Sequence, residues 1–90
     1  FAHDAEMQFK ADARRNKLVG LWAADLLGKS GDEANDYALT VVMADLEEAG
    51  IEDVVRKVAA DLAGKASADE IRAKMAELLP VAKAQLMSEL

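Results

Sequence analysis

Three glycines, Gly28, Gly50 and Gly64, each follow an apolar stretch of helical period, and they limit how this chain can fold. A residue in the left-handed conformation, usually glycine, commonly ends a helix. Ser30 and Ser67 are each followed three residues later by a glutamate, which matches the capping box at the start of a helix. These signals predict helices over residues 2–27, 31–49, 52–63 and 68–88.

The composition agrees with an all-α single domain that covers residues 1–90. Aromatic residues make up only 4% of the sequence, whereas β-sheets favour aromatic and β-branched residues. A chain of 90 residues forms one domain with a modest core. We therefore expect a four-helix bundle.

Apolar residues of the last three segments recur on one face at helical spacing. In segment 68–88 they continue past Pro80, which lies opposite that face, so we expect one Pro-kinked helix. In segment 31–49 they cover a wide arc that includes Leu39 and Met43, which suggests contact with two neighbours. The expected core faces consist of Ala38, Leu39, Val41, Val42, Met43, Leu46 and Ala49; Ile51, Val54, Val55, Val58 and Leu62; and Ala68, Ile71, Met75, Leu78, Leu79, Ala82 and Leu86.

The first segment carries apolar residues on two different faces. Its second half has a regular stripe, which consists of Leu18, Leu21, Trp22 and Leu26. A nearly opposite face carries Ala2, Ala5, Phe9, Ala13 and Gly20. One interpretation is that the C-terminal half of this long helix joins the bundle and the N-terminal half projects towards a partner. The other is that Phe9 packs on a neighbouring helix, and periodicity does not separate the two.

One run of positive charge adjoins Phe9. It consists of Lys10, Arg14, Arg15 and Lys17. These side chains are interpreted either as a solvated face paired with Glu6 and Asp12, or as a surface that docks on an acidic partner.

Several classes of function are disfavoured. The net charge of −6 opposes binding to nucleic acid and to anionic membrane surfaces, and the apolar runs are too short to span a membrane. No cysteine and only one histidine are present, so a zinc site is not expected and a cytosolic location fits best. Residues 1–10 are polar and of mixed charge, unlike a signal peptide.

No constellation of residues predicts catalysis. Gly28-Lys29-Ser30 is similar to the end of a phosphate-binding loop, but it follows a helix and lacks the earlier glycine. Asp25 and Asp45 fall in or beside apolar stripes, and they are interpreted as ion-paired or exposed more readily than as functional acids. We therefore expect no enzyme activity and no required cofactor.

Four runs in the first thirty residues form a recognisable pattern: FAHDAEMQFKA (residues 1–11), ARRNKL (13–18), GLWAA (20–24) and LLG (26–28). With this pattern the chain resembles the zeta subunit of the alphaproteobacterial F1-ATPase. The resemblance continues through residues 30–32, 37–38, 47–50 and 53–54, and more loosely to the C-terminus.

The resemblance implies a non-catalytic inhibitor of ATP hydrolysis. In that family an N-terminal segment inserts at a catalytic interface between the alpha and beta subunits, near gamma, and blocks rotation. The inhibitory segment begins upstream of the motif that opens this sequence, so residues 1–14 would be its remnant and its junction to the bundle. The residues that would contact the partner are Phe1, Ala2, Ala5, Met7, Phe9, Lys10, Arg14 and Arg15.

The same resemblance implies a cytoplasmic protein that is peripheral to the inner membrane through ATP synthase and monomeric when free. Weak binding of adenine nucleotide is a further implication, without a site on these residues. A rival interpretation is a small-ligand or nucleotide-binding helical bundle whose function lies between its helices.

Overall fold

A computed structural model describes residues 2–45 and 50–89, and four α-helices cover most of this part of the chain. They are α1 (Ala2–Leu26), α2 (Gly31–Ala44), α3 (Glu52–Leu62) and α4 (Ala68–Ser88). The predicted all-α bundle is confirmed, and three helices have nearly the predicted bounds. The second helix ends earlier than predicted, because Asp45 forms its C-cap. Residues 46–49 of that prediction lie outside the described residues.

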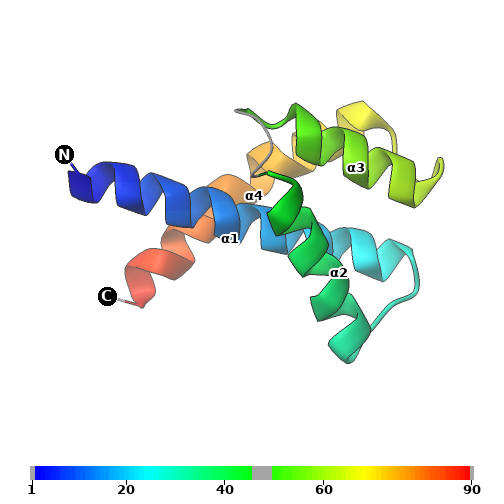
Figure 1. Cartoon of the computed structure of the whole chain (residues 1–90), viewed down its shortest axis with the longest axis horizontal. Helices are drawn as coiled ribbons and strands as arrows, with labels where there is room; N and C mark the ends of the chain where they lie inside the picture. The colour runs from blue at the N-terminus through cyan, green and yellow to red at the C-terminus, as the bar shows by residue number, and fades with distance from the viewer. Residues whose placement is uncertain (1, 46–49, 90) are drawn as a thin grey trace.

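The long α1 is the central helix and contacts the other three. Figure 1 shows α2 and α3 beside its C-terminal half and α4 crossing behind it. The N-terminal end of α1 and the C-terminal end of α4 lie at the same end of the molecule (Figure 1). This arrangement leaves the first turns of α1 beyond α2 and α3.

The core forms where the four helices meet. The largest fully buried apolar side chains are Leu62, Ile71, Met75, Val19, Val41, Val54, Val55 and Val58. The apolar stripes predicted for α3 and α4 are thus buried or half-buried. Pro80 lies inside α4 on an exposed side, and the helix continues on both sides of it.

The buried face of α1 differs from the predicted stripe. Val19, Ala23 and Ala24 are fully buried, whereas Leu18, Leu21 and Trp22 are half-buried and Leu26 is 39% exposed. The reason is that α1 has neighbours on several sides. Small side chains occupy the surfaces of closest approach, and the larger ones lie at the edges.

Gly20 lies at the closest approach of α1 to α2. It is buried, and a Cβ atom built on it would lie 2.7 Å from the Cα atom of Ala38. The side of α1 that carries Gly20 therefore packs against α2. The missing side chain lets the two helix backbones come together.

Three of the predicted helix-end signals can be followed in detail, and two of these three form as expected. Gly28 has φ +77°, and the Lys29 N–H donates to the Ala24 carbonyl at 2.9 Å, as in a Schellman motif. At the start of α4, Ser67 and Glu70 form the predicted capping box. The Ser30 side chain forms no such cap, so that prediction is wrong.

The failure at Ser30 has a local cause. Gly31, the first residue of α2, has φ +57°. A capping box needs helical geometry in the first turn, where the serine oxygen can meet an amide two or three residues later. The left-handed Gly31 turns the chain away from that geometry.

Polar contacts join the shorter helices. The Tyr37 hydroxyl of α2 donates to the Asp61 carboxylate of α3 at 2.9 Å, and Lys57 donates to the same carboxylate at 2.8 Å. Between α3 and α4, Arg72 donates twice to Glu52, at 2.8 and 3.1 Å. These contacts orient α3 at the edge of the core.

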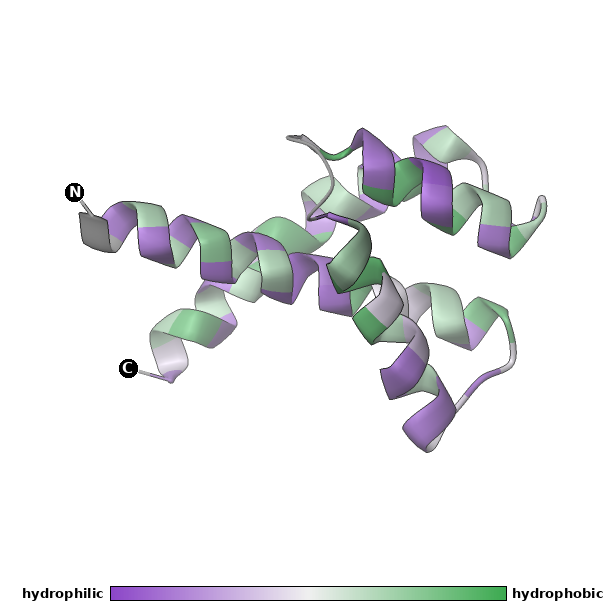
Figure 2. Cartoon of the chain, in the orientation of Figure 1, coloured by the Kyte–Doolittle hydropathy of each residue, from purple (hydrophilic) through white to green (hydrophobic). Residues whose placement is uncertain are grey.

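Each helix carries both polar and apolar residues along its length, as the hydropathy colours of Figure 2 show. Among residues 2–45 and 50–89, no helix has both the length and the apolar character that crossing a membrane requires.

Candidate partner-binding site

The N-terminal half of α1 reaches past α2 and α3 and lies beside the C-terminal end of α4 (Figure 1). It contains most of the residues predicted to contact a partner. Phe1 lies outside the described residues, and the side chain of Ala2 is not among those described. Ala5 is exposed to solvent.

Met7 faces α4. It lines a hollow of about 560 Å³ with Ala11 of its own helix and Leu86 and Met87 of α4. Met7 is half-buried and Ala11 is 2% exposed. The N-terminal half of α1 therefore does not project freely, because one of its sides rests on the end of α4.

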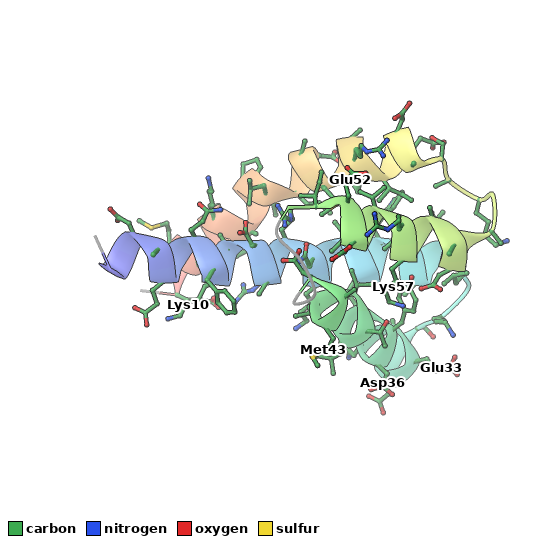
Figure 3. All side chains as sticks on the ribbon, turned by 45° about the horizontal axis from the view of Figure 1, so that its top comes forward. Lys10, Glu33, Asp36, Met43, Glu52 and Lys57 are labelled. Carbon is green, nitrogen blue, oxygen red and sulfur yellow. The ribbon has the colours of Figure 1, made fainter. Side chains whose placement is uncertain are left out.

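Phe9 lies on another side of the same turns and is 65% exposed. Its ring lines a shallow hollow together with Leu39 and Val42 of α2. Phe9 therefore lies near α2 but is not covered by it. Lys10, the next residue, is also exposed, and Figure 3 shows it on the N-terminal half of α1.

Arg14 joins α1 to the end of α4. Its guanidinium forms an ion pair with the Glu89 carboxylate at 2.7 Å and donates to the Gln85 side chain at 3.1 Å. The hydrogen bond from Arg14 lowers the pKa of Glu89. Arg14 thus holds the N-terminal half of α1 against the bundle.

Arg15 is only 7% exposed. Its Nε–H donates to the Asn16 side-chain oxygen at 3.1 Å, and its guanidinium lies 3.7 Å from the Asp12 carboxylate. Asn16 is fully buried, and its Nδ2 atom has no hydrogen-bond partner within the described part of the chain. In this structure Arg15 belongs to the packing of α1, and its contact with a partner stays a prediction.

Two exposed apolar side chains were assigned by sequence to the core face of α2. Leu39 is 58% exposed and Met43 is 61% exposed, although α2 does contact both α1 and α3. Ala38 and Val41 alone are buried on this helix. The apolar arc of α2 in the sequence is wider than its buried face, and this excess width was the sequence signal for an exposed apolar surface.

The residues considered for chemistry lie apart. Asp25 is exposed, and Asp45 is half-buried at the C-cap of α2. Gly28-Lys29-Ser30 forms the helix stop described above. Among the residues that the structure describes, no three or more His, Cys, Asp or Glu side chains are grouped to hold a metal ion.

Comparison with known proteins gives the family. The family model of the ATPase inhibitor subunit zeta matches residues 1–85. The chain belongs to the ATPase inhibitor subunit zeta family. No curated protein matches the chain.

One solved structure, determined by NMR in solution, is similar to this zeta-family chain throughout. It is 69% identical in sequence, covers 93% of this chain and 99% of its own, and superposes with a TM-score of 0.87. Members of the zeta family regulate the ATPase and are not enzymes, so membership implies binding to the F1-ATPase.

Proposed function

We propose that this chain inhibits ATP hydrolysis by the F1-ATPase by inserting its N-terminal segment, residues 1–14, at a catalytic alpha/beta interface near gamma. Inhibition by this route is steric and needs no reacting group on the inhibitor. The observation that carries the proposal is the 65% exposure of Phe9 on the half of α1 that extends beyond α2 and α3.

Phe9 is suited to be the main apolar anchor. Burying a phenylalanine side chain that is now largely exposed contributes about 2 kcal/mol, and aromatic anchors commonly dominate interfaces. Lys10 is exposed beside it and able to meet a carboxylate of the partner. Met7 would join them only after leaving its place on α4.

The junction holds the segment on its carrier. Arg14 ties α1 to Glu89 and Gln85 of α4, next to the turns that would insert. The bundle therefore presents the segment as a helix with an anchored base. A partly preformed helix loses less conformational entropy on binding than a disordered one.

The test is ATP hydrolysis by purified alphaproteobacterial F1-ATPase, titrated with this chain during turnover. Phe9→Ala should weaken inhibition about thirtyfold, which corresponds to about 2 kcal/mol. Val81→Ala, at an apolar position of α4 that is 41% exposed, is the matched control and should leave inhibition unchanged.

Absence of inhibition by this chain, with matched subunits and continuing turnover, would contradict the proposal. If the Phe9→Ala variant inhibits as strongly as the unmodified chain, Phe9 is not the main anchor.

The rival function, binding of a small ligand such as an adenine nucleotide, has weaker support. The charged residues that line the hollow between α1 and α4 are one lysine, Lys83, and one acid, Asp4. A nucleotide's phosphates usually require several hydrogen-bond donors or a helix N-terminus.

A further inference from the structure

Two shallow hollows on the α1–α2 face adjoin each other at Leu39. One, of about 380 Å³, is lined by Phe9, Leu39 and Val42, and the other, of about 510 Å³, by Leu39 and Met43. We call these four residues, Phe9, Leu39, Val42 and Met43, the apolar strip. Three of them, Phe9, Leu39 and Met43, are each more than half exposed. Exposed apolar side chains gathered in this way form a candidate binding surface.

The charges around the strip are positive. The charged residues that line the two hollows are Lys10, Arg14, Lys17 and Lys57. Arg14 and Lys57 already form ion pairs, with Glu89 and Asp61. Lys10 and Lys17 form no ion pair with any side chain that the structure describes. The charged side chains that line the two hollows are thus all basic, although the chain has a net charge of −6.

We infer that the apolar strip binds an amphipathic helix of the F1-ATPase that carries acidic side chains beside its apolar stripe. This inference rests on the proposed function and adds a second contact, made through the α2 residues of the strip, Leu39, Val42 and Met43. A surface formed along two helices accepts the apolar face of a third. Acidic residues flanking that face would reach Lys10 and Lys17.

The same charges disfavour a second copy of this chain as the occupant. In a two-fold symmetric contact the same patch lies on both sides, so the lysines of one copy would face those of the other. Both copies also carry a net charge of −6. An acidic partner avoids both repulsions.

The test measures the affinity of the full chain for purified alphaproteobacterial F1-ATPase, together with inhibition. The strip variant is the double substitution Leu39→Ser and Met43→Ser, which leaves residues 1–14 intact. A second variant, Lys17→Glu, reverses the charge of a lysine that lines the hollow beside the strip. The matched controls are Val81→Ser, at an exposed apolar position of α4, and Lys65→Glu, at an exposed cation in the α3–α4 turn. Circular dichroism checks that each variant folds.

We expect the double variant to lose affinity about tenfold or more, because two exposed apolar contacts are removed. Lys17→Glu should weaken binding, and the loss should shrink at high salt. Both controls should bind like the unmodified chain.

The outcomes separate the two proposals. Unchanged affinity of the strip variants, with inhibition intact, overturns this inference and leaves the proposed function standing. Binding that depends on the strip but never inhibits overturns the proposed function alone. Absence of binding by the unmodified chain overturns both, and a shift from dimer to monomer in the double variant would assign the strip to self-association instead.

Discussion

At the scale of single residues, Gly20 fixes how closely α1 and α2 approach. An alanine there would place its Cβ 2.7 Å from a backbone atom of Ala38, so a helix rather than a flexible side chain would have to move. Helix propensity alone favours alanine over glycine by about 1 kcal/mol. The clash should outweigh that gain, since overfilling a packed contact costs about 1–3 kcal/mol.

Gly20→Ala is therefore expected to lower the free energy of unfolding by about 1–2 kcal/mol. Urea unfolding followed by circular dichroism measures the change. A variant as stable as the unmodified chain, or more stable, would contradict the close approach of the two backbones.

The same residues show where sequence reasoning reached its limit. Periodicity identifies large apolar side chains, so it favoured Leu18 and Trp22 as the inner face of α1. Apart from Val19, the innermost positions are held by small or polar residues, namely Gly20, Ala23 and the fully buried Asn16. In a helix with neighbours on several sides, the positions that are buried depend on how closely each neighbour packs. The hydropathy pattern of the sequence does not give those distances. Arg15 was likewise read as a surface charge, although only 7% of it is exposed.

At the scale of elements, helix ends were the most predictable feature, because glycine and capping residues act through local backbone geometry. Gly28 and the Ser67–Glu70 pair work as the sequence indicates. Ser30 has the same spacing but fails, because its neighbour Gly31 adopts a left-handed conformation. The pattern that defines a capping box does not include the conformation of the next residue.

This difference predicts unequal effects of two identical substitutions. Ser67→Ala removes a side-chain cap and should cost about 1 kcal/mol of stability. Ser30→Ala removes no cap hydrogen bond, so a much smaller change is expected. Thermal unfolding of the two variants side by side measures both effects, and an equal loss in the two would contradict the assignment of the caps.

At the scale of the whole molecule, three carboxylates link different helices and have lowered pKa values. The hydrogen bond from Arg72 lowers the pKa of Glu52, and that from Arg14 lowers the pKa of Glu89. For Asp61, partial burial alone would raise the pKa, but hydrogen bonds from Lys57 and Tyr37 outweigh it and lower the pKa. Burial and the bond to Asp61 in turn raise the pKa of Tyr37.

These shifts predict that acid destabilises the fold. A carboxylate whose pKa is lower in the folded chain contributes stability above its unfolded pKa, which is 4.5 for glutamate and 3.8 for aspartate. That contribution is lost as the pH falls through the lower, folded pKa. Solvent screens exposed pairs such as Arg72–Glu52, so the loss per pair should be small.

The check is the unfolding temperature measured from pH 7 to pH 3. The unfolding temperature should decrease once the pH is lower than about 4.5. In the Asp61→Asn variant the unfolding temperature should decrease less steeply over the same pH range. Parallel curves for the variant and the unmodified chain would show that Asp61 is not one of the groups responsible.

The central claim is that the N-terminal segment enters a catalytic interface of the F1-ATPase. Site-specific photo-crosslinking tests it most directly, because the chain has no cysteine and one introduced by Ala5→Cys would be its only thiol. Ala5 is exposed, and its substitution leaves Phe9 unchanged. During ATP turnover, a photoreactive label at position 5 should crosslink to alpha or beta at a catalytic interface, while the same label placed by Val81→Cys should not. Crosslinks from position 5 only to other surfaces of the ATPase, with inhibition retained, would contradict insertion at the catalytic interface.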